Sequence, residues 1–504
     1  MRKLVSISLL ALWFVVTPFA VADDSTAIAQ LASSFHVENR FDGAVLVAKG
    51  DEILYEAGFG EADRSWGIPN RPDTVFLVGS VSKQFTAMLI LQLAAEGKLS
   101  LMDPLSKHLP DYPDNKANIT IHQLLTHTSG LPHYAGFFRI AVNLNDYLRL
   151  DRTVESYVDL IGRLPLDFEP GSEHDYSSMG YIVLAYIAEQ VTGKSYGQLI
   201  EERIAEPIGV SDLGFAYNDE TVERLAHGYM FDLRKAEDDK LTLEYYPEPY
   251  RDQSNKYSTG GVHGSVRALF HWARAAMGDE LLEPAWRDQM FTPHAENYGY
   301  GWRIDSGDTL GLAEDVEVIS HGGSLSGYKA SIVILDRGRY TVIALGNSSA
   351  ARSSALTQSI AQMLYDVDVD AANVLGTAVA WRMVRNGPDV ATDFFREQQA
   401  AGFPDYVESD YAFYIYAERF ADLGYPAYGQ RLAELGLEAH PDSAQIVLGL
   451  AMNQHALGDS SQARANAEKS IKLAGEQDGP DYVAEHAQEL IEEIDKAMPV
   501  AVGE

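Results

Sequence analysis

The chain has 504 residues, no cysteine and a formal net charge of −34 at pH 7, with 46% hydrophobic residues. The length predicts two or three domains, and the hydrophobic content is sufficient for a large core. The acidic balance disfavours nucleic acids and anionic membrane surfaces as partners. The lack of cysteine excludes disulfides and lipid attachment through an N-terminal cysteine.

Residues 1–22 have the pattern of a cleaved secretory signal. Arg2-Lys3 precedes the apolar run Leu4–Val16, and the small-residue site Ala20-Val21-Ala22 follows. A single membrane anchor is the alternative, but this run is shorter than the roughly 20 residues that a spanning helix needs. We expect a protein exported to a bacterial periplasm or secreted, without stable membrane insertion.

The stretch from Phe76 to Lys98 combines a short apolar run with a predicted helix. Ser80 lies at its first turn, and Lys83, three residues later, lies on the same helical face. A serine nucleophile needs a neighbour that takes its proton, and a desolvated lysine can serve because desolvation favours its neutral form. This pair is a candidate nucleophile and base. The alternative is a helix-capping serine beside a solvated lysine.

The same spacing also occurs at Ser326 and Lys329, so spacing alone is a weak signal. This second pair begins a predicted strand, in which residues three apart face opposite ways. The helical context therefore favours Ser80.

His122 and His127 are the candidates for a metal site in this part of the chain. Their spacing matches no zinc-binding helix pattern, and the chain has no cysteine that could join them. We expect neither a metal nor another cofactor.

The elements predicted on both sides of this stretch indicate an α+β fold. A helix over 27–35 and a β-hairpin around Lys49-Gly50-Asp51 come first, and a middle of helix and loop then extends to about residue 282. A helix around 355–365 closes the unit. One antiparallel sheet flanked by helices, with an inserted helical lobe, is the expected architecture of residues 23–367. The four strands predicted after the middle are 298–305, 316–323, 328–336 and 340–347.

From about residue 368 the sequence is helical. Leu423-Gly424 and Leu457-Gly458 lie 34 residues apart, which is the period of the tetratricopeptide helix pair. Two such units cannot bury a continuous core, so we expect the segments 370–405 and 481–496 to act as caps. An all-α tetratricopeptide-like domain over 368–504 is predicted. The alternative is an unrelated helical tail with a chance repeat.

Three further segments accompany Ser80 and Lys83 along the chain: 127–132 (HTSGLP), 176–178 (YSS) and 321–323 (HGG). With these motifs in this order, the chain resembles the serine β-lactamase-like family of the class C type. That family includes penicillin-binding D,D-peptidases, D-aminopeptidases, esterases and class C β-lactamases. The resemblance covers roughly residues 27–365 and implies a β-lactamase/transpeptidase-like fold.

The resemblance also implies roles for individual residues. Ser80 would attack a carbonyl and become the acyl-enzyme, and Lys83 would act as base or electrostatic partner. Tyr176 would pass the proton between the serine and the leaving group. The backbone N–H groups of Ser80 and Ser324 would form the oxyanion hole.

Two departures from the family pattern concern substrate binding. Ser178 stands where the family has asparagine, and His321-Gly322 stands where β-lactamases have lysine and threonine. The second change removes a permanent cation that would face a carboxylate. Gly322 and Gly323 allow a substrate backbone to approach the strand edge. We expect neutral His321 to donate a hydrogen bond to uncharged acyl donors, and pH near 6 to charge it.

These departures favour an esterase or a small-peptide hydrolase over a dedicated β-lactamase. A penicillin-binding D,D-peptidase or β-lactamase is one alternative. Another is a penicillin-binding-like sensor without turnover, whose output domain is the helical repeat region.

The interpretation as a serine hydrolase with a helical repeat domain predicts two kinds of partner. One is a small-molecule ester, amide or peptide substrate, and a protein or peptide can also bind the helical repeats, as a scaffold. The segment after residue 368 is expected not to build the active site. A truncated chain should keep turnover unless these helices cover apolar surface.

Overall fold

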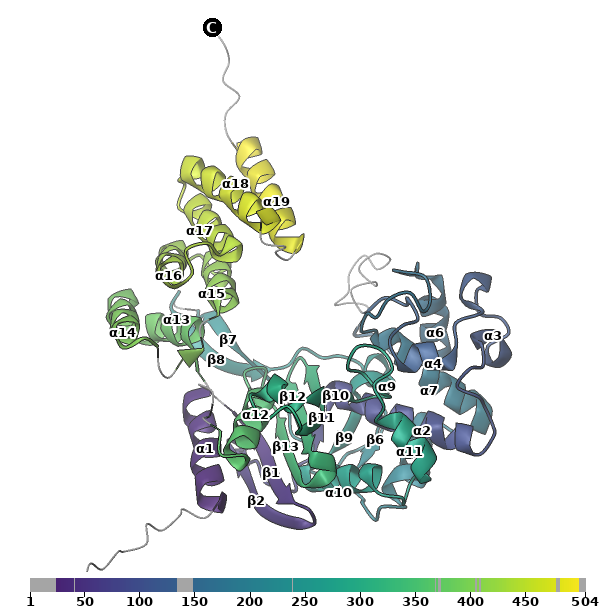
Figure 1. Ribbon diagram of the computed structural model, residues 1–504. Coiled ribbons are helices and arrows are strands. Elements are labelled where there is room, and N and C mark those ends of the chain that lie inside the picture. Colours follow the sequence, from purple (N-terminus) through teal and green to yellow (C-terminus); the bar gives the residue numbers. More distant parts are fainter. Residues whose placement is uncertain are drawn as a thin grey trace, which may run out of the picture.

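A six-stranded antiparallel sheet is the centre of the fold (Figure 1). The computed structural model describes residues 24–39, 41–133, 148–237, 239–367, 369, 373–403, 406–407, 409–476 and 481–497. The strand order β10-β11-β12-β13-β1-β2 places the N-terminal hairpin beside the last strand of the sheet. The strands are β10 (Arg303–Ser306), β11 (Glu317–Leu325), β12 (Tyr328–Leu335), β13 (Tyr340–Gly346), β1 (Gly43–Lys49) and β2 (Glu52–Phe59).

The hairpin of β1 and β2 confirms the prediction made from the sequence. The strands pair from Gly43 opposite Phe59 to Lys49 opposite Glu52, and Gly50 in the turn has φ +60°. β1 is buried on both faces and pairs along its whole length with β13. Segments some 300 residues apart in the chain therefore share one core, which confirms the α+β sheet predicted for this part of the chain.

Helices cover both faces of the sheet. α1 (Asp24–Asn39) and α12 (Ser353–Leu364) pack on one face, where Phe35 and Ile360 share a buried cluster with Val45 and Val342. The other face packs against α2 (Ser82–Ala95) and α10 (Val266–Met277). Of these, α2 is buried on all sides from Ser82 to Ala94, because the helical lobe encloses it.

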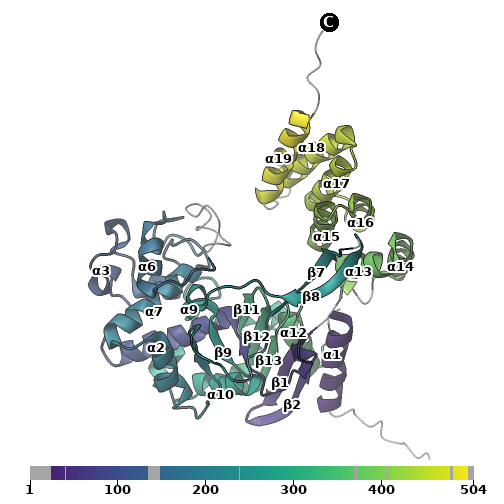
Figure 2. The same ribbon diagram turned by 180° about the vertical axis from the view of Figure 1, so that it is seen from behind.

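The lobe lies to one side of the sheet, opposite α1 (Figures 1 and 2). Its helix α7 (Ser178–Thr192) ends at Gly193, which has φ +70°. The other helices between the strands are α3 (Leu105–His108), α4 (Ile121–Leu125), α6 (Val154–Arg163), α8 (Tyr196–Ile200), a π-helix (Glu201–Ala205), α9 (Tyr257–Gly260) and α11 (Pro284–Met290). Short 3-10 helices are η1 (Gly79–Val81), η2 (Asp114–Lys116), η5 (Gln253–Asn255), η6 (Gly307–Leu310) and η7 (Asp336–Gly338). Small strands are β3 (Glu61–Asp63), β4 (Ile68–Pro69), β5 (Phe76–Leu77), β6 (Gly214–Phe215) and β9 (Val262–Gly264).

Two predictions about strands were wrong. The strand expected over 298–305 begins only at Arg303, because Gly301 has φ +78° and packs against the backbone of α2. The middle, expected to be helix and loop, contains the hairpin of β7 (Tyr229–Lys235) and β8 (Leu241–Pro247). This hairpin stands apart from the central sheet and points towards the C-terminal helices (Figure 1).

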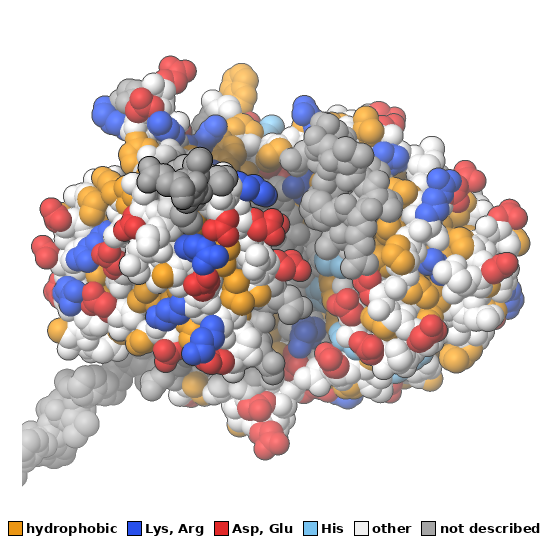
Figure 3. Space-filling model, turned by 90° about the horizontal axis from the view of Figure 1, so that it is seen from above, with side chains coloured by type: hydrophobic (Ala, Val, Ile, Leu, Met, Phe, Trp, Pro, Cys, Tyr) orange, Lys and Arg blue, Asp and Glu red, His pale blue; other side chains and the backbone are white. Residues whose placement is uncertain are grey.

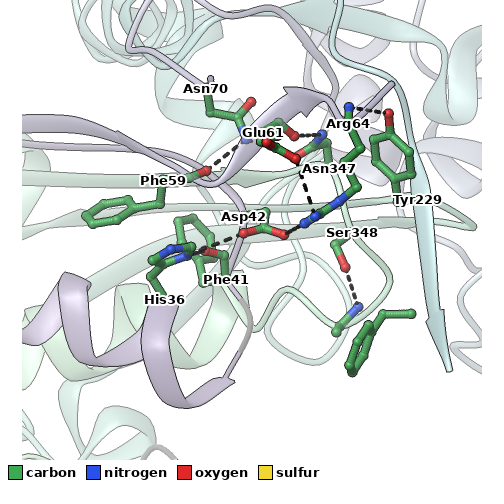
Figure 4. Close-up of polar contacts among 12 residues, drawn as sticks. His36, Phe41, Asp42, Phe59, Glu61, Arg64, Asn70, Tyr229, Asn347 and Ser348 are labelled. Carbon is green, nitrogen blue, oxygen red and sulfur yellow. Dashed lines mark hydrogen bonds and ion pairs between the residues drawn. The ribbon is translucent and has the colours of Figure 1, made fainter. Parts of the chain in front are cut away.

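A polar network holds the base of this hairpin (Figure 4). Asp42, just before β1, is paired with Arg64, whose backbone N–H donates to the Tyr229 hydroxyl at 2.8 Å. Asn347, directly after β13, is fully buried and donates to the His227 carbonyl at 2.9 Å. The start of β7 is therefore tied to the end of the central sheet.

The region after the sheet is helical, as expected. Gly424 and Gly458, the glycines of the 34-residue repeat, follow α15 and α17 and have φ of +80° and +87°. Both glycines thus adopt the left-handed conformation that ends helices. The helices are α13 (Leu375–Asn386), α14 (Pro388–Ala401), α15 (Asp410–Asp422), α16 (Pro426–Ala439), α17 (Ala444–Ala456), α18 (Ser460–Glu476) and α19 (Asp481–Ala497), with the short parallel strands β14 (Asn373–Val374) and β15 (Tyr406–Val407).

The hairpin of β7 and β8 belongs to the core of this helical region. Leu233 has no exposed surface and packs in a cluster with Leu375, Val379 and Phe413. Nη2 of Arg419, in α15, donates a hydrogen bond to the Leu233 carbonyl oxygen at 3.3 Å. The helices therefore cover apolar surface that a segment before residue 368 contributes.

Among the described residues, no helix combines the length and the apolar composition needed to cross a bilayer. The predicted signal segment, residues 1–22, lies outside the described residues.

Candidate active site

Ser80 lies in η1, at the junction between the strand β5 and the buried helix α2. Gly79 before it has φ +56°, a conformation that residues with a side chain adopt rarely. This turn leaves Ser80 partly exposed while its neighbours Gly79 and Val81 are buried. The serine hydroxyl is thus presented at the surface of a cavity by a rigid, buried segment.

Lys83 has no exposed surface, and its Nζ lies 3.2 Å from Ser80 Oγ. Desolvation by burial lowers the pKa of Lys83 to about 7. The Nζ also lies 4.8 Å from the centre of the Tyr176 ring and 5.8 Å from that of Tyr181. The structure therefore brings together Ser80, Lys83 and Tyr176, the three residues that the sequence motifs indicated as catalytic.

The strand β11 passes unusually close to η1. A Cβ atom on Gly79 would lie 2.7 Å from the Ser324 nitrogen, and one on Gly323 would lie 2.0 Å from the Val78 oxygen and 3.2 Å from the Ser80 nitrogen. Only glycine fits at both positions. The backbone nitrogens of Ser80 and Ser324 consequently lie in neighbouring segments beside the serine hydroxyl, as an oxyanion hole requires.

His127, from the HTSGLP segment, packs against Tyr176 with ring centres 4.3 Å apart. Its Nδ1 accepts a hydrogen bond from the Ser177 backbone N–H at 3.1 Å, so the proton of the neutral ring resides on Nε2. Burial lowers the pKa of His127 well below its usual value, and the nearby charge of Lys83 lowers it further. A neutral imidazole therefore supports the ring of Tyr176 and the start of α7.

The structure corrects the role expected for His321. Its Nδ1 donates to the Gly322 carbonyl at 2.7 Å, which leaves Nε2 to accept from the Tyr298 hydroxyl at 3.0 Å. Both ring nitrogens are thus bonded to the protein, and neither has a proton to offer an ester. Burial, with a smaller effect of Lys83, lowers the pKa of His321 to about 3, so the expected charging near pH 6 was also wrong.

Ser178 is buried at the start of α7. Its side chain is 1% exposed, and it begins α7 without lining the cavity that contains Ser80. Its backbone N–H donates to Nδ1 of His133 at 3.3 Å. The structure therefore places Ser178 in the packing of the helix start.

The cavity at Ser80 has a volume of about 640 Å³. It lies where the molecule is hollowed between the sheet and the lobe, a hollow in which histidine side chains are visible (Figure 3). Tyr176, His321, Gly322, Gly323 and Ser324, which the sequence motifs indicated as site residues, line it. The lining also contains Tyr298, Arg303, Lys329 and Arg352, which no sequence motif indicated as site residues.

Lys329 had been noted only as part of the second Ser-x-x-Lys spacing. In the structure its Nζ donates to Ser324 Oγ at 2.7 Å, and the side chain comes from β12. Because Lys329 lies on a strand and its amine bonds to Ser324, it is not paired with Ser326. This agrees with the choice of Ser80 as the candidate nucleophile. The signal that could have revealed its role is its register position opposite Ser324.

The described part of the chain contains no group of three or more metal-ligating side chains. His122 Nδ1 lies 2.9 Å from the Tyr300 hydroxyl, and the ring packs edge-on against His294. The two histidines considered from the sequence thus lie in separate packing contacts.

Comparison with known proteins agrees with this geometry. The family model described as Beta-lactamase matches residues 28–364. The chain is 30% identical over 337 residues to penicillin-binding protein 4* of Bacillus subtilis (strain 168), covering 62% of this chain and 69% of that protein. It is 33% identical over 294 residues to esterase EstB of Burkholderia gladioli, covering 53% of this chain and 74% of that protein.

A solved structure shows the same fold. The penicillin-binding protein from Bacillus halodurans superposes with a TM-score of 0.55 at 27% sequence identity, over 66% of this chain and 99% of that one. The family match ends at residue 364 and therefore leaves out the C-terminal helical region. From the residues that surround Ser80, the order of the motifs and these matches, the chain belongs to the Beta-lactamase family.

Proposed function

We propose that this protein is a serine hydrolase that cleaves an ester or amide through an acyl-enzyme on Ser80. The observation that carries the proposal is the contact of 3.2 Å between Ser80 Oγ and a fully buried lysine whose pKa is lowered to about 7. At neutral pH a large fraction of Lys83 has no proton and can accept one. A solvated lysine, with a pKa near 10.4, could not do so.

The reaction has two steps. Ser80 Oγ attacks the substrate carbonyl as its proton passes to Lys83, and the bond to the leaving group breaks as that group takes a proton through Tyr176. Water then attacks the acyl ester, gives a proton back to Ser80 and releases the carboxylic acid. The N–H groups of Ser80 and Ser324 stabilise the oxyanion of both tetrahedral intermediates, which can contribute a few kcal/mol.

The names of two relatives, a penicillin-binding protein and an esterase, support acyl transfer to a serine. The protein from Bacillus subtilis is named a penicillin-binding protein and the one from Burkholderia gladioli an esterase. We favour an esterase or small-peptide hydrolase. The alternative is a penicillin-binding D,D-peptidase or β-lactamase, or a penicillin-binding-like sensor in which the acyl group stays on Ser80.

Deacylation separates these functions. Intact-mass measurements at increasing times should show transient acylation with 4-nitrophenyl acetate, together with multiple turnovers of nitrophenol release. Ser80→Ala should abolish both, whereas the matched Ser326→Ala should retain them. A permanent adduct with benzylpenicillin and no ester turnover would identify the sensor, and turnover that survives Ser80→Ala would contradict the proposed nucleophile.

The domain organisation and the location are part of the same proposal. Residues 1–22 act as a signal peptide, 23–367 form the hydrolase domain and 368–504 form a tetratricopeptide-like domain with a surface for a protein or peptide partner. The sequence pattern of residues 1–22 supports export to the periplasm or the medium. Mass determination of the mature protein, secreted from a bacterial host, tests the cleavage after Ala22.

A further inference from the structure

The cavity at Ser80 has an unusual charge for this protein. Among the described residues, the charged side chains in its lining are Arg303, Lys329 and Arg352, and no aspartate or glutamate of this part of the chain lines it. The chain as a whole has a formal net charge of −34, and acidic side chains are spread over the visible surface (Figure 3). A cationic cavity in such an acidic protein requires an explanation.

Two of these cations lack a counter-ion among the described residues. Lys329 donates to a hydroxyl, Ser324 Oγ, and forms no ion pair there. Arg352 has a buried Nη1 without an acceptor in the described part of the chain. Burial alone lowers the pKa of both side chains, with no carboxylate acting against it. Arg303 differs, because it is more exposed and lies 3.5 Å from Asp305.

Both side chains are partly buried. Desolvating a cation without a counter-ion costs free energy, and an anion bound beside Lys329 and Arg352 would offset that cost. The arrangement is also held in place without a ligand. Ser353 Oγ, at the start of α12, donates to the Lys329 carbonyl at 3.0 Å and so fixes the helix start against β12. Little reorganisation would be needed on binding.

The start of α12 adds donors to the same wall. Arg352 is its N-cap residue and provides no side-chain acceptor for the first turn. The backbone N–H groups of that turn therefore lack a side-chain cap, and they favour negative charge near them. The hydroxyl of Ser354, also in the cavity lining, lies beside them.

Gly322 connects this wall with the nucleophile. β10 pairs with β11 only as far as Ser320, so the strand edge beyond it is free of a neighbouring strand. A Cβ on Gly322 would approach Ser354 Oγ to 3.6 Å, whereas Gly323 faces η1 and Ser80. Because Gly322 has no side chain, the cavity continues around the strand edge from Ser80 to Lys329 and Arg352.

We propose that this hydrolase binds substrates that carry an anionic oxygen group, a carboxylate or a phosphate, between Lys329 and Arg352 while their carbonyl lies at Ser80. The cation that is missing at position 321 is thereby supplied from the α12 side of the sheet. This inference rests on the proposed function and adds the substrate class to it.

Matched pairs of esters test the inference with the full chain. On the leaving-group side, 3-carboxyphenyl acetate and 3-(phosphonooxy)phenyl acetate are compared with neutral 3-(methoxycarbonyl)phenyl acetate. On the acyl side, mono-4-nitrophenyl glutarate is compared with its methyl ester. We expect kcat/KM for at least one anionic ester to exceed that of its neutral partner by about tenfold, the effect of one charge-assisted contact. The preferred ester shows whether the group is a carboxylate or a phosphate.

Variants then locate the preference. Lys329→Met and Arg352→Gln should each reduce the ratio of anionic to neutral kcat/KM by about tenfold. Lys469→Met removes an exposed cation from α18 and should leave the ratio unchanged. Turnover of the neutral esters shows that each variant is folded.

Ratios near one for every pair in the unmodified protein would overturn the inference, and so would ratios that both variants leave unchanged. In either case, Ser80-dependent hydrolysis of the neutral esters would leave the proposed function intact. If no ester of either kind were hydrolysed in a Ser80-dependent reaction, the proposed function and the inference would both be wrong.

Discussion

Lys83 Nζ lies 3.2 Å from Ser80 Oγ, at the end of a side chain that has no contact with solvent. The helix α2 that carries Lys83 is itself enclosed by the lobe and the sheet. Burial therefore does two things at once, since it fixes the distance to the serine and removes the water that would keep the lysine charged. The pH dependence of the reaction should report this relationship.

We expect kcat/KM for a neutral ester to rise with pH through about 7, because the pKa of Lys83 is lowered to about 7 and only its neutral form accepts the serine proton. Lys83→Met should lower kcat about 10²- to 10⁴-fold. Lys116→Met is the matched control, since Lys116 is also buried but lies in η2, outside the cavity. An acid limb that persists in residual Lys83→Met activity would assign the titration to another group.

Gly323→Ala should lower kcat about 10²- to 10³-fold, the effect of losing one oxyanion donor. The new Cβ would lie 2.0 Å from the Val78 oxygen, so β11 must move away from η1 and take the Ser324 nitrogen with it. Gly475→Ala is the control, because its Cβ would meet no atom within 4 Å. Steady-state kinetics with a neutral ester measure the effect, and unchanged kcat in Gly323→Ala would contradict a role for the Ser324 N–H.

Acid should destabilise the protein below the ordinary histidine pKa. Burial lowers the pKa of His321 to about 3 and that of His263 to about 4, so between pH 6.5 and these values the unfolded chain binds more protons than the folded one. Stability therefore falls as pH falls through this window. His321→Gln should flatten the dependence of Tm on pH there, whereas exposed His227→Gln should not. An equal slope in His321→Gln would show that other groups cause the acid transition.

Truncation after residue 367 should destabilise the hydrolase part, contrary to the simplest expectation from the sequence. The helices α13 and α15 cover Leu233 of β7, which has no exposed surface. In the full chain, Leu233→Ala should cost about 2–5 kcal/mol of unfolding free energy, measured by denaturant titration. Leu457→Ala, at a site 49% exposed, is the control and should cost little. A truncated protein with the Tm and turnover of the full chain would show that the hairpin needs no cover.

The hairpin of β7 and β8 also contacts the strands of the active site, so truncation can change activity as well as stability. Glu248, directly after β8, accepts a hydrogen bond from the Gly327 backbone N–H at 3.1 Å. Gly327 lies in the turn between β11 and β12, the strands that carry Ser324 and Lys329. We therefore expect the truncated chain to lose discrimination between anionic and neutral esters together with its stability, in the assays described for Lys329.

Local patterns in the sequence were sufficient for much of the fold and for the centre of the site. The helical spacing of apolar residues placed Ser80 within reach of Lys83, and in the structure Ser80 lies in η1, directly before α2. The turn around Gly50 indicated the first hairpin. Such features depend on neighbours within a few residues, which the sequence displays directly. The hairpin of β7 and β8 was missed because the cover of Leu233 comes from helices more than 140 residues later in the chain.

The sequence by itself determined which residue types stand at the nucleophile, and it ordered the motifs around them. Only the tertiary structure decided which of the other polar residues face the cavity. His321 and Lys329 show the difference, since a strand position says nothing about which hydrogen-bond partners lie across it. Tyr298 and the Gly322 carbonyl occupy both nitrogens of His321, while β12 and α12 bring Lys329 and Arg352 to one wall. Charge and hydrogen bonding depend on distances between segments far apart in the chain, and these distances exist only once the sheet and its helices have packed.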